Sequence, residues 1–286
     1  LPISMRRTIA ATLSVFALTA ALAACGGSSD DASPGKPTQP TAKVPTLDIL
    51  VTNDDGYAAP GIDALVSRLR ELPGVEITVV APATNQSGTS DRTTPGPVTA
   101  LTTMKVTTAS GYPATAVSGY PADAVNYALE VLKLTPDLVV SGSNAGQNMG
   151  VVAPASGTVG AARTAVRLGY PAVAVSQGLD DRADYAPSVD VAADWISLNR
   201  AALSGSVDRN DLLEVVNVNA PACPKPRGPV TEPLSTTGTG LGDVDCASTA
   251  AAGPDDTTSF LHGFARITFL THRKSTRLNS SHVALS

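Results

Sequence analysis

The stretch LDILVTNDDGYAAPG, residues 47–61, decides the fold. Its first part, Asp48 to Thr52, is an apolar, β-branched run that is short enough to be a buried parallel strand. The run breaks at residues 53–56, where glycine allows the positive φ of a tight turn. Pro60 suits the first turn of a helix, and leucines and other apolar residues follow at helical spacing. Asp54 and Asp55 therefore lie where a first strand leads into a first helix, the sheet edge at which α/β proteins bind ligands.

Two adjacent carboxylates repel each other, and they stay ionised together most easily when a cation lies between them. Hard divalent ions such as Mg²⁺ and Mn²⁺ prefer oxygen ligands of this kind. The alternative is that Asn53 to Gly56 is only a turn with favourable turn chemistry, and these four residues alone favour that alternative. Other parts of the sequence must decide between the two.

Composition narrows the classes of partner. A chain of 286 residues can form one large α/β domain or two small ones. The formal charge is −5, and residues 1–25 and 272–286 contribute five cations and no acid, so the part between them carries −10. Such an acidic protein lacks the basic surface that a nucleic-acid polymer needs. It must handle phosphate through a metal ion or through oriented backbone N–H groups.

The N-terminal residues predict export. A short basic segment at residues 5–7 precedes an apolar run from Ile9 to Ala23, which is typical of a signal peptide. The sequence Leu-Ala-Ala-Cys at residues 22–25 resembles the bacterial lipoprotein processing box, in which Cys25 becomes the lipidated residue; an ordinary signal peptide with a chance cysteine is the alternative. Residues 26–44 have almost nothing to bury and are expected to form a flexible tether. We therefore expect a protein on the periplasmic side of the envelope that touches the membrane only through this lipid anchor.

The remaining pattern predicts a doubly wound, mostly parallel sheet of the Rossmann-like type over residues 45–271. We expect a hairpin between residues 98–106 and 114–117, and Trp195 within the core. A β-rich extension outside the sheet is expected over residues 221–262. Further strands are predicted at residues 75–82, 137–141, 171–176, 213–219 and 264–270, and further helices over 119–132, 156–168 and 189–203.

Two polar segments follow the predicted strands. The loop after residue 141 is glycine-rich and offers the amides of Asn144 and Asn148. Ser156, Gly157 and Thr158 open the next helix, where hydroxyl and free N–H groups form a natural phosphate site. An ordinary loop with a Ser/Thr helix cap explains the same residues equally well.

The C-terminal region gives one prediction about its cysteines and another about its last residues. Cys223 and Cys246 in an exported protein are expected to form a disulfide, with two separate thiols as the alternative. Residues 272–286 change character abruptly and resemble translated sequencing-adapter sequence, so we exclude them from the fold. All three histidines lie in the last quarter of the chain, which leaves no zinc cluster.

Five segments in order resemble the SurE family of metal-dependent 5′/3′-nucleotidases and exopolyphosphatases. Together they cover about residues 47–175: Asn-Asp-Asp-Gly at 53–56 with Ala-Pro-Gly at 59–61, Ala-Pro at 81–82 with Asn-Gln-Ser-Gly at 85–88, Gly-Tyr-Pro-Ala-Asp at 119–123, Ser-Gly-Ser-Asn-Ala-Gly at 141–146 with Asn148, and Ser-Gly-Thr-Val at 156–159.

The resemblance implies one divalent ion, Mg²⁺ or Mn²⁺, and a set of residues that bind the substrate. The expected metal ligands are Asp54, Asp55, Ser87 and Asn144. The expected phosphate and substrate ligands are Asn53, Asn148, Ser156, Gly157 and Thr158. Asp54 either activates the attacking water or attacks phosphorus itself, and the sequence leaves both routes open.

The activity that the resemblance implies is hydrolysis of nucleoside monophosphates, and of short polyphosphate. The alternatives are a lipid-anchored protein that binds nucleotide or phosphate without turnover, and a broad-specificity acid phosphatase. Members of the family exchange a C-terminal segment between subunits, and residues 272–286 do not match that segment, so a homodimer or a larger oligomer stays an open expectation. The sequence lacks the motifs of three other enzyme classes, namely serine hydrolases, P-loop enzymes and haloacid-dehalogenase-type phosphatases.

Overall fold

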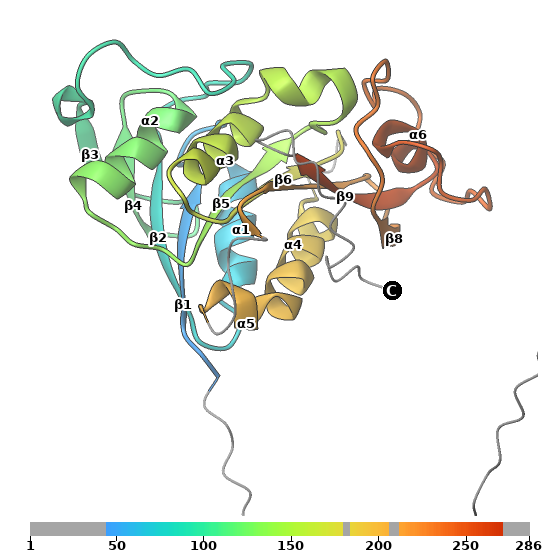
Figure 1. Ribbon diagram of the computed structural model, residues 1–286, viewed down its shortest axis with the longest axis horizontal. Helices are drawn as coiled ribbons and strands as arrows, with labels where there is room; N and C mark the ends of the chain where they lie inside the picture. The colour runs from blue at the N-terminus through green and yellow to red at the C-terminus, as the bar shows by residue number, and fades with distance from the viewer. Residues whose placement is uncertain (1–43, 180–183, 206–211, 271–286) are drawn as a thin grey trace, which may run out of the picture. The chain divides into compact units, whose positions relative to one another are not determined.

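The described part of the chain contains a single sheet of nine strands, in the order β3-β4-β2-β1-β5-β6-β7-β9-β8 (Figure 1). The structure is a computed structural model that describes residues 44–179, 184–205 and 212–270. Neighbouring strands are parallel except for the pairs β3–β4 and β7–β9. The strands are β1 (Leu47–Thr52), β2 (Val75–Pro82), β3 (Thr103–Thr107), β4 (Pro113–Val117), β5 (Leu138–Ala145), β6 (Ala172–Gln177), β7 (Val215–Ala220), β8 (Arg227–Val230) and β9 (Phe264–Leu270).

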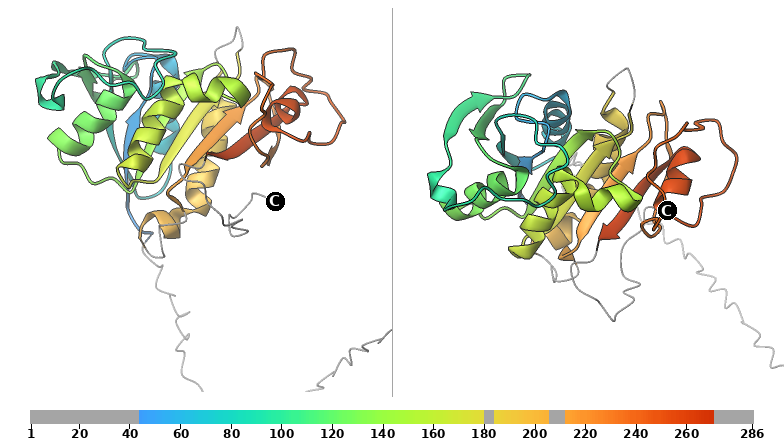
Figure 2. Two further views of the ribbon diagram at one scale, coloured as in Figure 1. Left: turned by 45° about the horizontal axis from the view of Figure 1, so that its top comes forward. Right: turned by 90° about the horizontal axis from the view of Figure 1, so that it is seen from above.

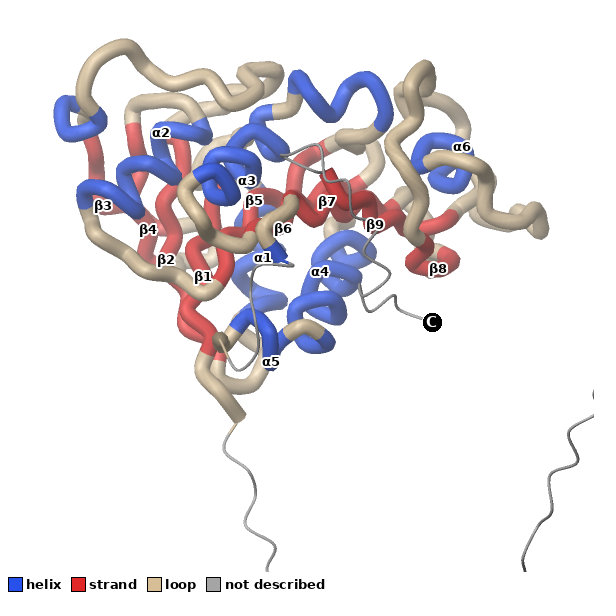
Figure 3. The backbone as a smooth tube through the Cα atoms, viewed as in Figure 1, coloured by secondary structure: helices blue, strands red, loops and turns tan. Residues whose placement is uncertain are grey.

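Helices cover both faces of the sheet, as Figures 2 and 3 show. One face carries α2 and α3, which pack against each other, and the opposite face carries α1 and α4. The helices are α1 (Pro60–Leu69), α2 (Pro121–Asn126), α3 (Gly157–Arg167), α4 (Ala186–Leu198), α5 (Arg200–Leu203) and α6 (Asp256–Leu261). None of the helices in the described ranges is long and apolar enough to span a membrane.

The two-sided burial explains why β1 is an almost continuous apolar run. Ile49 and Val51 point into the core under α1 and α4, whereas Leu50 points into the core under α2 and α3. A strand that is covered on both faces has no solvent side on which polar residues could alternate. Trp195 of α4 is buried in the first of these cores, as the sequence predicts.

The doubly wound, mostly parallel sheet is confirmed, with differences at some element ends. Val98–Ala100 forms a short 3₁₀ turn instead of strand. The helix expected over residues 119–132 begins at Pro121 and changes to a π-helical turn at Tyr127–Val131. Strand β5 continues four residues beyond Ser141, through an irregularity between Ser141 and Asn144, and it thereby carries Asn144 on the sheet itself.

The expectation of a β-rich extension outside the sheet is wrong. Of residues 221–262, the segment Arg227–Val230 is the outermost strand of the sheet, where it pairs in parallel with β9, and Asp256–Leu261 is helical. The rest of the extension is irregular. Arg-Gly-Pro-Val shows no alternation, and its proline is tolerated because this is an edge strand, so the local sequence gives no strand signal.

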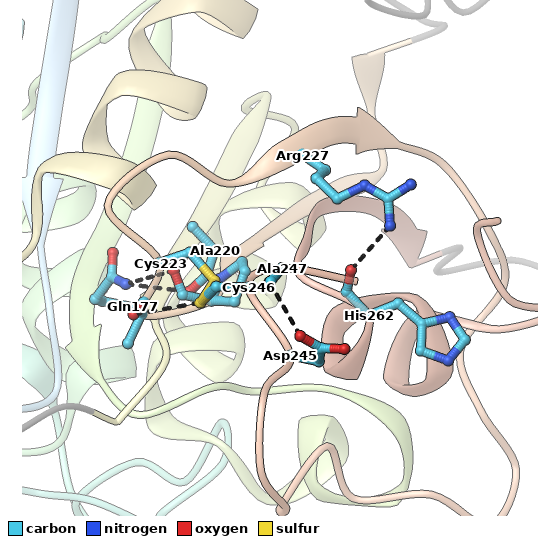
Figure 4. Close-up of a disulfide and its surroundings, with 10 residues drawn as sticks. Gln177, Ala220, Cys223, Arg227, Asp245, Cys246, Ala247 and His262 are labelled. Carbon is cyan, nitrogen blue, oxygen red and sulfur yellow. Dashed lines mark hydrogen bonds between the residues drawn. A yellow bond between two sulfur atoms is a disulfide. The ribbon is translucent and has the colours of Figure 1, made fainter. Parts of the chain in front are cut away.

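The disulfide between Cys223 and Cys246 is confirmed and ties the extension back to the sheet. Figure 4 shows it beside Gln177 and Ala220, at the ends of β6 and β7. The bond closes a separation of 23 residues along the chain. The predicted signal peptide with Cys25, most of the predicted tether and the predicted tail at 272–286 all lie outside the described residues.

Candidate functional site

The predicted site residues gather at the point where the strand order reverses. β1 lies between β2 and β5 in the sheet. The strands that directly follow β1 in sequence, β2 to β4, lie on one side of it, and the strands from β5 onward lie on the other side. Asp54 and Asp55 follow β1, and Asn144 lies near the end of β5, its neighbour in the sheet. Open α/β sheets bind their ligands in the crevice at such a switch point.

The turn after β1 is held by Asn53, whose side chain is fully buried. Its Nδ2 donates to the Gly56 carbonyl (2.9 Å), and the Gly56 N–H donates to its Oδ1 (3.2 Å). Gly56 has φ +100°, and a Cβ there would lie 3.2 Å from the Thr84 carbonyl carbon. Residues 53–56 therefore do form a tight turn, which was the alternative to a metal site. The turn also places the two carboxylates. The role of Asn53 in substrate binding stays a prediction, because its amide is bonded within the turn.

Asp54 is buried, with 3 % of its surface exposed, against the first turn of α3. The Thr158 hydroxyl donates to its Oδ1 at 2.6 Å. A Cβ added to Gly157 would lie 2.8 Å from its Oδ2, so only glycine leaves room for the carboxylate there. Burial, together with a smaller contribution from the charge of Asp55, raises the pKa of Asp54 to about 6 against the hydrogen bond from Thr158.

Asp55 is half-buried and joins two neighbouring loops. Its Oδ1 accepts a hydrogen bond from Asn85 Nδ2 (3.1 Å), and its Oδ2 accepts one from the Ala145 N–H (3.2 Å). Burial raises the pKa of Asp55, and these two hydrogen bonds oppose that effect. The Gln86 N–H also donates to the carbonyl of Asp54 (2.7 Å). The loops after β1 and β2 and the end of β5 therefore converge on the two carboxylates.

Asn148 sets the direction of the Thr158 hydroxyl. Its Nδ2 donates to Thr158 Oγ1 (3.3 Å) and to Ser176 Oγ (2.9 Å), which uses both amide protons. Since Thr158 Oγ1 accepts from Asn148, its single proton is given to Asp54. The geometry thus supports Asn148 as a residue that orients Thr158, and direct binding of phosphate by its amide stays a prediction.

Two asparagines that the sequence analysis did not single out hold the backbone of Asn148. Asn217 and Asn219 lie on β7 and are fully buried. The Asn148 N–H donates to Asn219 Oδ1 (2.7 Å), and the Asn148 carbonyl accepts from Asn217 Nδ2 (2.8 Å) and Asn219 Nδ2 (3.3 Å). Alternating asparagines in an otherwise apolar strand are the signal that was available, because buried amides need partners.

The structure places the other predicted ligands around this cluster. Ser156 caps α3 by accepting the Val159 N–H (3.2 Å), so the helix-cap alternative holds for this residue. Asn144 donates from Nδ2 to the Gly146 carbonyl (2.6 Å), and its Oδ1 accepts no hydrogen bond from any described residue. Ser87 is exposed, and among the described residues its contact with the cluster is through its N–H, which donates to Asn85 Oδ1 (2.9 Å).

The donor set fits a hard divalent cation. In the part of the chain that the structure describes, no three His, Cys, Asp or Glu side chains form a group that could hold a metal. The predicted set of metal ligands consists of the carboxylates of Asp54 and Asp55, the amide oxygen of Asn144 and the hydroxyl of Ser87. Oxygen ligands of these kinds suit Mg²⁺ or Mn²⁺, and burying two adjacent carboxylates together favours a cation between them.

Fold and cluster together define a doubly wound α/β protein with an acidic, oxygen-rich site at its switch point. The sequence profile of the family described as "Survival protein SurE" matches residues 49–238. The 5′-nucleotidase SurE of Symbiobacterium thermophilum is 39 % identical over 190 residues, which is 62 % of this chain and 67 % of that protein. The 5′/3′-nucleotidase SurE of Yersinia pseudotuberculosis (serotype O:3, strain YPIII) is 38 % identical over 179 residues, or 62 % of this chain and 64 % of that protein.

Among solved structures, that of the SurE protein from Aquifex aeolicus superposes with a TM-score of 0.63 at 26 % identity. The superposition covers 80 % of this chain and 95 % of that one. The chain belongs to the SurE family.

Proposed function

We propose that this protein is a divalent-metal-dependent phosphomonoesterase that hydrolyses nucleoside 5′- and 3′-monophosphates to nucleoside and phosphate, with short polyphosphate as a further substrate. The observation that carries the proposal is the hydrogen bond of 2.6 Å between Thr158 and Asp54. It joins a buried carboxylate after β1 to the start of α3, a helix N-terminus of the kind that binds phosphate. The nucleotidase names of the curated relatives support the choice of substrate.

The residues that would hold the cation are Asp54, Asp55, Ser87 and Asn144. When bound, a divalent cation neutralises phosphate charge and lowers the pKa of a coordinated water. This part of the proposal is supported by the donor set described above and by the acidity of residues 26–271, which would repel phosphate without such a charge.

The start of α3 would bind the phosphate oxygens. Main-chain N–H groups of the first turn of a helix have no partner within the helix and carry the positive end of its dipole. Ser156 satisfies the N–H group of Val159, and the Thr158 N–H hydrogen-bonds the carboxylate of Asp54. The N–H of Gly157, at the first position of the helix, is then the group that we propose for a phosphate oxygen. Gly157 lets the helix approach Asp54 closely enough to place phosphate and carboxylate side by side.

Asp54 would act on the attacking oxygen. The Thr158 hydroxyl occupies its Oδ1 and fixes the plane of the carboxylate, which leaves Oδ2 as the atom that acts. That oxygen either accepts the proton of the attacking water or attacks phosphorus directly. Trapping of a phosphoryl-enzyme with rapid acid quench would distinguish the second route from the first.

The first experiment is phosphate release from nucleoside monophosphates, tripolyphosphate and a chromogenic phosphomonoester, each with Mn²⁺, Mg²⁺ or EDTA. We expect release that depends on metal, is highest with nucleotides, and falls at least a hundredfold in Asp55→Asn. Asp48→Asn is the matched control, because it removes an exposed carboxylate from the opposite end of β1. Equal activity of Asp55→Asn and Asp48→Asn would refute the assignment of the site.

Two other outcomes would replace the proposal by its alternatives. Saturable nucleotide binding without product at any metal concentration, in a protein with a native circular-dichroism spectrum, would indicate a binding protein. Release that persists in EDTA and peaks at acid pH on all three substrate types would indicate a broad-specificity acid phosphatase.

We also propose that the protein is exported and anchored through a lipid on Cys25, on the sequence pattern of residues 5–25. Its substrates would then be phosphomonoesters outside the cytoplasm. Metabolic labelling with a radioactive fatty acid tests the anchor: the label should be incorporated by the full chain and absent from Cys25→Ser. Label in both, or in neither, would contradict it.

A further inference from the structure

The loop between β5 and α3 carries the phosphate side of the candidate site, and the C-terminal segment holds it. This loop, residues 146–155, contains Asn148 and ends at the cap of α3. The Val151 N–H donates to the Gly238 carbonyl (3.0 Å), and Gln147 Nε2 donates to the Gly240 carbonyl (2.8 Å). These contacts join segments about ninety residues apart in sequence. The position of the loop therefore depends on the segment from residue 235 to residue 256.

Asp256 is the charged group in this contact, and it is fully buried. Its Oδ2 accepts the Gly150 N–H (3.0 Å), and its Oδ1 accepts the Ser235 N–H (2.7 Å). One carboxylate thus joins the loop of the site to the extension, with one oxygen for each side. An amide in its place has a single acceptor and would turn an NH₂ group toward one of the two N–H donors.

A buried cation lies near Asp256. Arg266 of β9 is also fully buried, and its guanidinium forms an ion pair with Glu232. A buried charge is costly unless it is paired and hydrogen-bonded, and Asp256 has two N–H donors and a nearby cation. Leu or Val at this position would leave both N–H donors unpaired, so the buried carboxylate meets a requirement for two directed hydrogen bonds.

The turn at Gly150 that Asp256 holds is close in sequence to Asn148 of the candidate site. Gly150, with φ +49°, lies two residues after Asn148, and a Cβ there would lie 2.0 Å from the Gly238 carbonyl oxygen. Asn148 in turn gives its amide proton to Thr158, the partner of Asp54. A shift of the Gly150 turn would therefore move Asn148 and the start of α3.

We propose that Asp256 is a positioning residue for phosphate binding: by holding Gly150 against the extension it fixes Asn148, Thr158 and the first turn of α3. This inference rests on the proposed function. Asp54, Asp55, Ser87 and Asn144, the predicted cation ligands, lie on segments without a hydrogen bond to Asp256 in the described structure. Asp256 therefore acts on phosphate affinity more strongly than on cation affinity, which it reaches only through the contact of Thr158 with Asp54.

The test compares Asp256→Asn with Asp255→Asn in the full chain. Asp255 is the neighbouring carboxylate, and it caps the same helix by accepting the Thr258 N–H (2.8 Å). Its other hydrogen bonds come from Thr257 and Ser235 and not from the site loop. For each protein the measurements are the dissociation constant of inorganic phosphate in the presence of Mn²⁺, the Mn²⁺ concentration for half-maximal activity, the KM and kcat for a nucleotide, and the midpoint of urea unfolding.

We expect Asp256→Asn to weaken phosphate binding and raise KM about tenfold, while half-saturation by Mn²⁺ changes less than twofold. Asp255→Asn should lower the unfolding midpoint and leave phosphate affinity as in the wild type. Unchanged phosphate affinity in Asp256→Asn would overturn the inference, and so would an equal loss in Asp255→Asn, because the effect would then come from helix α6. If the wild-type protein binds phosphate but shows no turnover, the proposed function is refuted and the inference about Asp256 is not. The phosphate affinities of the two variants would then still decide the role of Asp256.

If Asp256→Asn does not fold, Ser235→Ala provides the second variant. It keeps the carboxylate and removes the hydroxyl that accepts the Gly238 N–H (2.9 Å), which loosens the segment that contacts Val151. A selective, smaller rise in the dissociation constant of phosphate is expected. No change in that constant would overturn the inference.

Discussion

Replacing Thr158 by valine tests the contact on which the candidate site depends. Valine has nearly the shape of threonine, and Thr158 is fully buried, so the main effect of the change is to remove the hydroxyl that bonds Asp54 and Asn148. The lost hydrogen bond is 2.6 Å long and ends on a buried carboxylate. Hydrogen bonds to charged groups are worth about 1.5–3 kcal/mol, which corresponds to about a tenfold to hundredfold change in rate.

The assay is kcat/KM for a nucleoside monophosphate at saturating Mn²⁺. We expect a loss of about tenfold to hundredfold in Thr158→Val, mainly in kcat, because the hydroxyl fixes the plane of Asp54 and does not contact the nucleoside in the proposed mode of binding. Asn148 keeps its second partner, Ser176, so the loop should stay in place.

Thr164→Val is the matched control for that variant. Thr164 lies on the same helix, is buried, and gives its hydroxyl proton to the carbonyl of Gly160 (2.9 Å). Its replacement should change kcat/KM less than twofold. If Thr158→Val retains wild-type kcat/KM, or if both variants lose activity equally, the hydrogen bond to Asp54 has no role in the reaction.

Three further variants test other parts of the structure. Gly157→Ala would place a methyl group 2.8 Å from Asp54 Oδ2, so kcat/KM should fall at least about tenfold and the free energy of unfolding by about 1–3 kcal/mol, as measured by urea titration. The double variant Cys223→Ser, Cys246→Ser opens a 23-residue separation and should lower the free energy of unfolding by about 3 kcal/mol without changing KM. Partial burial of Asp63 raises its pKa, but three hydrogen bonds outweigh burial and set the pKa below 3.8. Asp63→Asn should therefore be less stable than wild type at pH 7, with a difference that closes as the pH falls below 3.8.

The sequence predicts those parts of the site that depend on local chemistry. The turn at residues 53–56 and the start of α3 at Ser156 are short-range features, since a buried strand, a glycine and a hydroxyl at a helix start each act within a few residues. The order of parallel strands then brings them to one edge of the sheet. The convergence of Asp54, Asp55 and Thr158 follows from these local features together with the order of the strands.

Features that depend on distant pairing were not predictable in the same way. Asn219 and Asn148 meet across 71 residues, and Asp256 meets Gly150 across 106, and neither spacing leaves a periodic trace in the sequence. Strand β8 is set by its neighbour β9 and not by its own residues. Where a segment takes its conformation from a partner far along the chain, its own pattern carries little information.

Asp54 distinguishes a turn that happens to be acidic from a site built for a ligand. A turn needs only Asn53 and Gly56, which hold each other by two hydrogen bonds, and an exposed aspartate would satisfy it equally well. Burial instead raises the pKa of Asp54 from 3.8 to about 6, which costs the folded state about 3 kcal/mol at pH 7 in the absence of a cation. A folded protein without a cation should therefore lose stability as the pH rises from 3.8 through about 6, because the unfolded state releases the proton first.

Asp54→Asn removes that cost, and we expect it to abolish turnover while raising the free energy of unfolding in EDTA at pH 7 by up to about 3 kcal/mol. Urea unfolding of both proteins at pH 4 and pH 7 is the measurement, and the gain should be small at pH 4. A variant that is less stable than wild type at pH 7 in EDTA would mean that the carboxylate stabilises the fold by itself. A gain in stability together with a loss of activity would mean that the fold accepts a destabilising carboxylate because the bound ligand requires it.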